Sequence, residues 1–251
     1  MVTSGKLSTI TEWSITVVGV IRGWRLLSGS ISTRTVLAVD FTLAKVRAQA
    51  NFGDLAPHLP PDCAVWGSDE TGWPAAPGDA REHFAQWRER TAALGSFHAV
   101  LGFCAGAALA GSLAGDARLV LFDPVAVSSA TIAEHYAAAV RRMGAQPDAP
   151  PDADVDDLAE RYAFVAGKAL REQGVPDSIA AELCARVAAN LRYLAMCRVV
   201  GLDGRRPDLV VLSRDHELPA VLAGCPQLRL DVSQEQLLAE PGAAHAAVPR
   251  R

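Results

Sequence analysis

The feature that most constrains this chain is a short apolar segment that runs into a glycine-flanked cysteine. Residues 99–103 are apolar and bounded by small residues, which is typical of a buried strand, and the alanine-rich segment after Gly106 favours a helix. Gly102 and Gly106 flank Cys104 in the Gly-X-nucleophile-X-Gly spacing, in which small residues let a strand turn sharply into a helix. The sequence therefore predicts a strand-to-helix corner with a thiol at its tip.

The Cys104 thiol has a functional and a purely structural interpretation. The backbone N–H of Ala105 would point into the same space from the helix N-terminus, where it could hold an oxyanion. A buried cysteine is, however, usually a small apolar side chain, and glycine and alanine are frequent in this chain. The five-residue spacing alone leaves both interpretations open.

Composition limits the class of protein. With 251 residues, 50% of them apolar and 21% charged, the chain can bury one sizeable core, and we expect a single domain over residues 1–251. A net charge of −4 without a long Lys/Arg block argues against a nucleic-acid-binding surface. Arg22 and Arg25 interrupt the chain after the apolar patch at 15–21, and no clean small-residue cleavage site follows, so we predict no signal peptide and no membrane span.

The cysteines indicate a reducing compartment. Their number is odd, and their positions lack the paired spacing of a zinc site. We therefore expect free thiols in a cytoplasmic protein without a metal. The five are Cys63, Cys104, Cys184, Cys197 and Cys225.

Strand-like and helix-like patterns alternate around the corner. Alternation with short connections predicts a mostly parallel sheet with right-handed crossovers. Strands are expected at 15–21 (an edge strand), 35–41, 63–67, 99–103, 118–122, 209–212 and 228–232. Helices are expected at 43–59, at 80–94 after an Asp79 cap, after Gly106, and at 234–247 with a weak point at Pro241-Gly242.

The segment from about 125 to 206 differs from the rest because it carries no strand pattern. Three helical patterns, at 129–143, 155–173 and 177–198, are separated by breaker-rich loops. They predict a helical lid packed over the carboxyl edge of the sheet, where it can wall off a substrate chamber.

An acid follows the strand that comes after the corner. Asp123 stands at the carboxyl end of 118–122, on the edge where parallel sheets place their functional sites. The simpler alternative is that Asp123 only caps a turn before Pro124. If strands 35–41 and 99–103 are neighbours, the loop at Phe41-Thr42 also lies beside Cys104.

Together these features resemble the α/β-hydrolase thioesterases of nonribosomal-peptide and polyketide assembly lines, over about residues 35–248. The resemblance is carried by the Gly102–Gly106 corner, the strand-end Asp123, the lid, and the tail Leu237-Leu238-Ala239-Glu240-Pro241. It implies an α/β-hydrolase-like fold with Cys104 in the nucleophile position, which is usually serine, and Asp123 as the triad acid. The substrate would arrive as a thioester on the phosphopantetheine arm of an acyl or peptidyl carrier protein, with no bound cofactor.

Two positions depart from this family. The family has a glycine-rich turn after its first matched strand, where this chain has Phe41-Thr42-Leu43-Ala44, so the second oxyanion donor expected at Thr42 lacks its usual setting. The catalytic histidine normally lies three or four residues before the tail, where this chain has Ser233 and Gln234.

The base must therefore come from elsewhere, if there is one. His216 follows a strand end and so lies on the correct edge of the sheet, and we take it as the first candidate, with His135 in the lid as the second. Each also has an ordinary structural explanation, as do the remaining His58, His83, His98 and His245.

Three functions remain open from the sequence. The first is an enzyme that acts on an acyl thioester through Cys104, as a cyclase, an acyltransferase or an editing thioesterase. A thiol supplies some thiolate at neutral pH without a base, so such an enzyme tolerates a degraded triad, and it would favour acyl transfer or cyclisation over hydrolysis. Cysteine-bearing relatives that close rings, such as Dieckmann-type cyclases, resemble this arrangement. The alternatives are a catalytically degenerate protein that binds a carrier protein or an acyl chain, and a small-ester α/β hydrolase.

Overall fold

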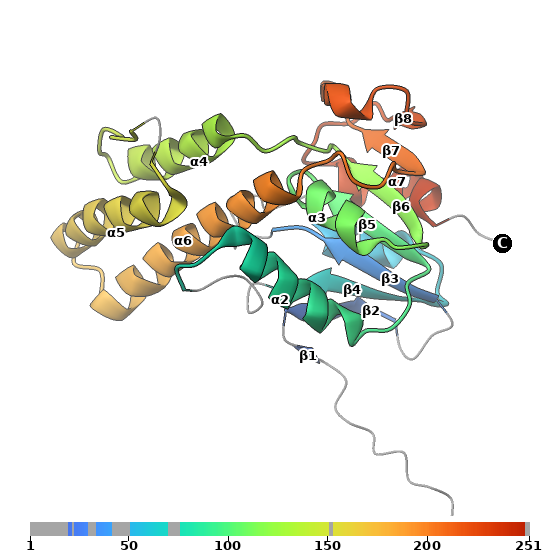
Figure 1. Cartoon of the computed structure of the whole chain (residues 1–251), viewed down its shortest axis with the longest axis horizontal. Coiled ribbons are helices and arrows are strands. Elements are labelled where there is room, and N and C mark those ends of the chain that lie inside the picture. The colour runs from blue at the N-terminus through green and yellow to red at the C-terminus, as the bar shows by residue number, and fades with distance from the viewer. Residues whose placement is uncertain are drawn as a thin grey trace, which may run out of the picture.

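The computed structural model describes residues 20–21, 23–29, 34–41, 51–69, 76–150 and 153–248. Within these ranges the strands form one eight-stranded sheet in the order β1-β2-β4-β3-β5-β6-β7-β8 (Figure 1). The strands are β1 (Val20–Ile21), β2 (Trp24–Ser28), β3 (Arg34–Val39), β4 (Cys63–Ser68), β5 (Ala99–Phe103), β6 (Arg118–Phe122), β7 (Leu209–Leu212) and β8 (Gln227–Arg229).

The sheet is parallel from β4 through β8, as the sequence predicted, and antiparallel only where β1 and β2 are added at one edge. Strand β5 lies inside the sheet, between β3 and β6. Val39 pairs with Gly102, and Phe103 pairs with Phe122. The carboxyl ends of these three strands therefore meet at one edge, directly beside Cys104.

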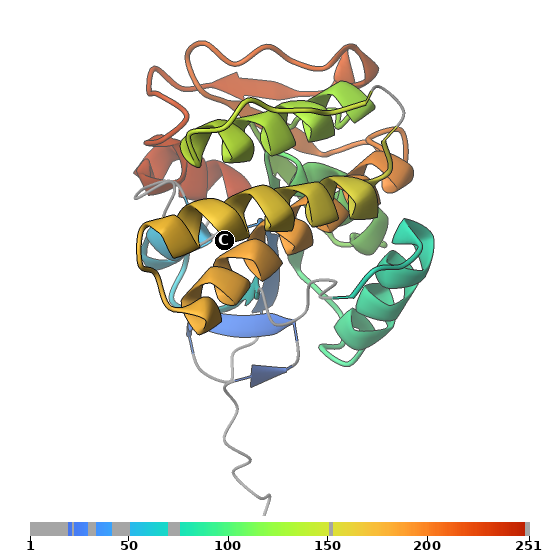
Figure 2. The same cartoon turned by 90° about the vertical axis from the view of Figure 1, so that its left-hand side faces the viewer.

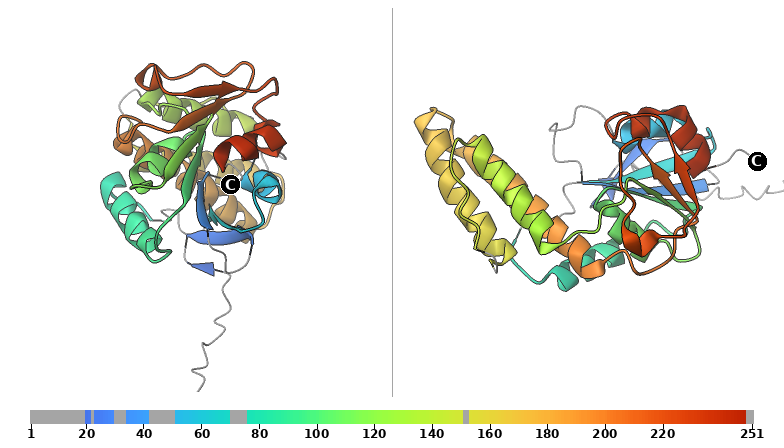
Figure 3. Two further views of the ribbon diagram at one scale, coloured as in Figure 1. Left: turned by 90° about the vertical axis from the view of Figure 1, so that its right-hand side faces the viewer. Right: turned by 90° about the horizontal axis from the view of Figure 1, so that it is seen from above.

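Both faces of the sheet are covered, which explains why its strands are continuously apolar. Successive side chains alternate between two core clusters: Leu119 and Leu121 belong to one, and Val120 and Phe122 to the other. The first cluster includes residues of α2 (Ala80–Ala92) and α3 (Gly106–Leu113), and the second includes residues of α1 (Phe52–Leu55) and α7 (Pro241–Ala247). Figure 2 and the left view of Figure 3 show these helices on opposite sides of the strands.

Three long helices fall within the predicted lid and end within two residues of the expected positions. They are α4 (Ser129–Arg142), α5 (Val155–Glu172) and α6 (Asp177–Val200), and they extend beyond the sheet in the right view of Figure 3. Ser128 and Asp154 cap α4 and α5 through their side chains. Among the described residues, no helix is long and apolar enough to cross a membrane.

Helix α6 connects the lid to the sheet. It has 24 residues, which corresponds to a length of about 36 Å. Apart from Ala180, its buried side chains lie between Asn190 and Cys197, in the half that packs on the sheet layer, whereas its first half pairs with α5. The buried half of α6 therefore holds a wall of side chains over the edge where β3 and β5 end.

Several expected boundaries need correction. In place of a helix over 234–247 there is a 3-10 turn, Leu237–Ala239, and then α7, which starts at Pro241. Proline suits the first turn of a helix but restricts the residue before it, and Glu240 is accordingly extended, with φ −77° and ψ 121°. Of the helix expected at 43–59, the described part contains only α1 and a 3-10 turn, Ala56–His58.

At the N-terminal side, the sequence analysis missed β2 altogether. Of the edge strand expected at 15–21, Val20–Ile21 form β1, and the preceding positions lie outside the described residues. Strand β8 is also shorter than expected, ending at Arg229 rather than at residue 232.

The predicted corner is confirmed, with Cys104 between β5 and α3. Its φ is 54°, a left-handed conformation that is rare for residues other than glycine. Backbone hydrogen bonds hold it there: the Cys104 N–H donates to the Phe122 carbonyl at 3.0 Å, and the Cys104 carbonyl accepts from Val125 N at 3.2 Å. The corner is thus tied to the end of β6 and to the loop that follows it, which stabilises a conformation that costs energy by itself.

The two flanking glycines are required by close approach of the backbone. A Cβ on Gly102 would lie 2.7 Å from the Ala107 Cα and from the Ala110 Cβ, and one on Gly106 would lie 2.5 Å from the Val39 carbonyl oxygen. Neither neighbour can move easily, since the first belongs to α3 and the second to β3. Glycine at these positions therefore lets α3 turn back tightly onto the sheet.

Gly106→Ala should lower the free energy of unfolding by about 2 kcal/mol, because the added methyl overlaps a backbone carbonyl. Gly111→Ala is the matched control in the same helix, since its Cβ would meet only Leu119 Cδ2 at 4.0 Å. In the control, the free energy of unfolding should rise by up to about 1 kcal/mol, because alanine has a higher helix propensity than glycine. Urea unfolding compares the two, and equal effects would contradict the close approach at Gly106.

Candidate functional site

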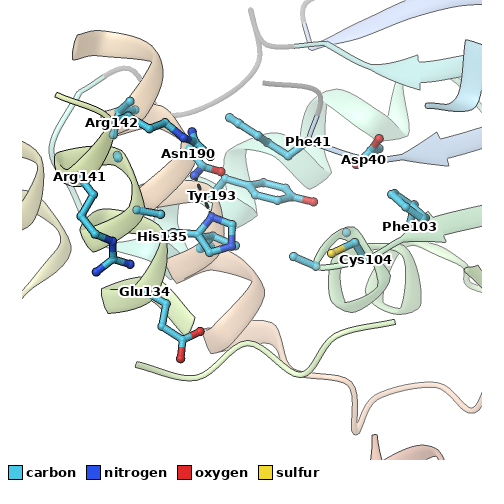
Figure 4. A pocket seen from close by; sticks show the side chains of 16 residues that line it. Asp40, Phe41, Phe103, Cys104, Glu134, His135, Arg141, Arg142, Asn190 and Tyr193 are labelled. Atoms are coloured by element: carbon cyan, nitrogen blue, oxygen red, sulfur yellow. Dashed lines mark hydrogen bonds between the residues drawn. The ribbon is translucent and has the colours of Figure 1, made fainter. Parts of the chain in front are cut away.

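A chamber opens in front of the Cys104 corner, between the carboxyl edge of the sheet and the lid helices α4 and α6. Its volume is about 640 Å³. Figure 4 shows Cys104 on one side of this Cys104 chamber and side chains of α4 and α6 on the other. The lining residues are Asp40, Phe41, Phe103, Cys104, Ala105, Gly106, Glu134, His135, Ala138, Ala139, Arg141, Arg142, Val187, Asn190, Tyr193 and Leu194.

Cys104 is the only one of the five cysteines that lines this chamber, and all five are free thiols. Burial raises the pKa of Cys184 and, far more strongly, that of Cys197. Burial also raises the pKa of Cys63, although Arg34 opposes this. Those thiols stay protonated at neutral pH, whereas Cys104 is half-buried and faces a space large enough for a substrate.

Tyr193 forms a buried part of the chamber wall beside the start of α3. Its ring stacks on Phe41 with centroids 4.7 Å apart, and its hydroxyl lies 2.8 Å from where a Cβ of Gly106 would be. Burial, together with the nearby Cys197 and Asp40, raises the pKa of Tyr193 well above the ordinary value. The hydroxyl is therefore protonated at any working pH and can donate a hydrogen bond.

The two expected oxyanion donors have different outcomes. Ala105 stands at the N-cap of α3 and lines the chamber, as the corner predicted. Thr42 lies outside the described residues, so its N–H is not placed. Its neighbour Phe41 does line the chamber, which agrees with the prediction that the loop after β3 lies beside Cys104.

Asp123 is fully buried at the end of β6, in a left-handed conformation with φ 40°. Its carboxylate is held by Ser213 at the end of β7: Oδ1 accepts from the Ser213 N–H at 2.8 Å, and Oδ2 accepts from the Ser213 hydroxyl at 2.7 Å. Both oxygens thus have a structural partner. The acid joins the ends of two neighbouring strands, whatever further role it has.

His216 reaches Asp123 but does not line the Cys104 chamber. Its Nδ1 lies 3.9 Å from Asp123 Oδ1, and its Nε2 lies 3.0 Å from the Pro124 carbonyl oxygen. A carbonyl oxygen only accepts, so Nε2 carries the proton in this arrangement. That nitrogen cannot take a proton from Cys104 unless the ring turns.

His135, the second candidate, is the one imidazole of the six that lines the chamber. It projects from α4, and its Nδ1 lies 3.5 Å from the Asn190 side-chain nitrogen on α6. The other histidines lie elsewhere. His58 and His245 border a hollow beside α7, His83 borders one beside α2, and His98 precedes β5 at the opposite edge of the sheet.

Sequence reasoning missed several chamber residues, although a signal for them existed. On α4, residues 135, 138, 139 and 142 follow helical spacing, as do residues 187, 190, 193 and 194 on α6. Such spacing marks one helix face but does not say what that face meets. Gln234 and Ser233, the positions of the family histidine, do not line the chamber. Among the described residues, no cluster of His, Cys, Asp or Glu could hold a metal ion.

No protein-family model matches the chain, and no curated protein matches its sequence. Solved structures do match. The Vlm2 thioesterase domain, with genetically encoded 2,3-diaminopropionic acid bound with a dodecadepsipeptide, has a TM-score of 0.53 at 14% identity, covering 90% of this chain and 96% of that chain. The α/β hydrolase MGS-M2, from a Medee basin deep-sea metagenome library, has a TM-score of 0.51 at 9% identity, covering 89% and 91%. An α/β hydrolase from Sphaerobacter thermophilus has a TM-score of 0.50 at 19% identity, covering 89% and 93%.

Ser213→Ala should lower the free energy of unfolding by about 2 kcal/mol, since it removes a buried hydrogen bond to a carboxylate. Ser233→Ala is the control, because Ser233 is exposed and bonds only to Gln236. It should change stability by less than about 0.5 kcal/mol. Urea unfolding of both variants measures the difference, and a Ser213 effect no larger than the control would argue against the structural role of Asp123.

Proposed function

We propose, from the α/β-hydrolase fold that this chain shares with these structures, that the protein is a thioesterase-like enzyme in which Cys104 accepts an acyl group from a thioester. The observation that carries the proposal is the Cys104 thiol, held in a strained corner and facing a chamber of about 640 Å³. The donor would be an acyl thioester on the phosphopantetheine arm of a carrier protein. A role in the biosynthesis of peptide or polyketide secondary metabolites would follow.

The proposed reaction requires a thiolate, a thioester and a hydrogen-bond donor for the oxyanion. The Cys104 thiolate attacks the thioester carbonyl, a new C–S bond forms, and the bond to the pantetheine sulfur breaks. The departing thiolate takes up the proton that Cys104 lost, so one thioester replaces another at little net cost. The developing oxyanion lies near the N-terminus of α3, where the Ala105 N–H is available to stabilise it.

The fate of the acyl group depends on activation of the next nucleophile. Hydrolysis requires a base that activates water, and the expected partners are engaged elsewhere: Asp123 holds Ser213, and His216 Nε2 donates to the Pro124 carbonyl. An amine or a carbanion within the substrate needs less help than water. Transfer or cyclisation is therefore favoured over hydrolysis.

A second candidate function is favoured by the same observation, that Asp123 is bonded to Ser213 and His216 to the Pro124 carbonyl. The protein would then bind a carrier protein or an acyl chain without turnover. In that case the chamber would hold the acyl chain, while Cys104 would remain unmodified. The third alternative, a small-ester hydrolase, predicts turnover of simple esters instead of carrier-type thioesters.

Incubation with hexanoyl-pantetheine should add one hexanoyl group to the protein, seen by intact-protein mass spectrometry. Cys104→Ala should abolish the addition. Cys184→Ala is the matched control, since Cys184 is also half-buried but lies on α6 outside the chamber, and it should be acylated like the parent protein.

Other outcomes separate the alternatives. Saturable binding of hexanoyl-pantetheine without a covalent product favours the binding protein and contradicts acyl transfer. Hydrolysis of p-nitrophenyl hexanoate that survives Cys104→Ala, without acylation by the thioester, favours the ester hydrolase.

A further inference from the structure

His135 stands on the wall of the chamber opposite the nucleophile. Figure 4 shows its ring extending from α4 into the chamber, toward the side where the Cys104 thiol lies. Both residues line the same space, one from the lid and one from the sheet edge. His135 is solvent-exposed on the chamber side, so its position on α4 is not explained by a need to pack in the core.

Asn190 is a buried hydrogen-bonding partner for this imidazole. It lies in the buried half of α6 with only 9% of its surface exposed, and its amide is 3.5 Å from His135 Nδ1. The two ends of an amide have nearly the same shape, so a half-turn presents its oxygen to Nδ1 instead. Nδ1 then donates to that oxygen, and in this tautomer Nε2 is the nitrogen that carries the lone pair. This is the way an asparagine orients the histidine beside a catalytic cysteine in papain-like proteases.

Other groups around the chamber are poorer bases for a thiol. Tyr193 is protonated, and carboxylates such as Asp40 and Glu134 are intrinsically much weaker bases than imidazole. His216 holds its Nε2 proton against Pro124. An imidazole is the side chain whose basicity suits proton transfer near neutral pH.

We propose that His135, oriented by Asn190, is the general base of Cys104, so that the catalytic pair is completed across the chamber by the lid. This rests on the proposed acylation of Cys104. His135 Nε2 takes the thiol proton as the thiolate attacks, and the imidazolium returns that proton to the departing pantetheine sulfur. Asn190 is a positioning residue, since it acts only through His135.

The charged groups that face this pair come from several elements. Helix α4 contributes Glu134, Arg141 and Arg142, and the end of β3 contributes Asp40. The arginines favour a thiolate, and the two carboxylates disfavour it. Asp123 follows β6 and is bonded to Ser213, and buried Tyr193 and Cys197 on α6 are protonated. Of the side chains that line the chamber, His135 is the one whose type ordinarily changes charge between about pH 5 and 8.

The test measures the rate of Cys104 alkylation by iodoacetamide from pH 5 to 10, followed by mass spectrometry in a Cys184→Ala background. With its base, Cys104 should react below the ordinary thiol pKa of ~8.5. His135→Gln should remove this low-pH limb of the rate–pH profile and leave only the rise in rate near or above pH 8.5. His216→Gln is the matched control and should keep the parent profile, and Asn190→Ala should lose part of the low-pH limb.

Acylation by hexanoyl-pantetheine provides the second readout. His135→Gln should slow it about 100-fold at pH 7 and little at pH 10, where the thiolate forms unaided. His135 is exposed, so the substitution removes no core packing, and far-ultraviolet circular dichroism checks the fold.

The outcomes separate the two proposals. Acylation of Cys104 with the same pH profile in parent and His135→Gln overturns the role of His135 and leaves the proposed function standing. Loss of the low-pH limb in His216→Gln instead assigns the base to His216 and also overturns it. A His135-dependent alkylation limb without acylation at any pH supports the Cys104–His135 pair but overturns the proposed function.

Discussion

The close approach of α3 to the ends of β3 and β5 is the constraint on which the rest of this site depends. Glycine at 102 and 106 permits that approach, and the hydrogen bonds of Cys104 to the β6 side hold the residue in a conformation that it would otherwise avoid. The thiol is thereby presented at a helix N-terminus, at the one edge of the sheet where several strands end together. For the proposed reaction, a rigid thiol position would be useful because a small displacement of reacting atoms costs much of the rate.

The end of β6 shows how a predicted catalytic residue can have a structural task. Asp123 is buried and has both carboxylate oxygens satisfied by Ser213, so it ties β6 to β7. His216 stands nearby but directs its Nε2 to a backbone carbonyl. In the order of the sequence these residues form a triad with Cys104, whereas in space their hydrogen bonds serve the edge of the sheet. The acyl-enzyme proposed above would need no activated water to react onward, which agrees with this arrangement.

The lid contributes more than a cover to the chamber. The buried half of α6 brings Asn190 and Tyr193 against the sheet edge, and α4 packs beside it with His135. If His135 is the base proposed above, its reach to Cys104 would depend on the distance between α4 and the corner.

The sequence by itself determined the elements that depend on local patterns. The apolar run of β5 with its flanking glycines specifies the corner, and the helical periodicity from 129 to 200 specifies the lid helices to within two residues. Where local signals are weak or conflict, the prediction failed. The start of the last helix was placed too early, before Pro241, and strand β2 was missed. Pro241 restricts the backbone of Glu240, which is extended, so the helix cannot begin earlier. Strand β2 has little strand pattern of its own and is stabilised by pairing with β4.

Only the tertiary structure decided which side chains meet. The separation of His135 and Asn190 in sequence is 55 residues, and that of Asp123 and Ser213 is 90. Such contacts depend on how helices and strands pack, because packing fixes the direction of each side chain, and no local spacing encodes it. The position of Cys104 at the corner follows from the backbone that the corner requires. Which histidine lies near Cys104 depends on the packing of α4 and α6, and for that reason the sequence left two histidines open.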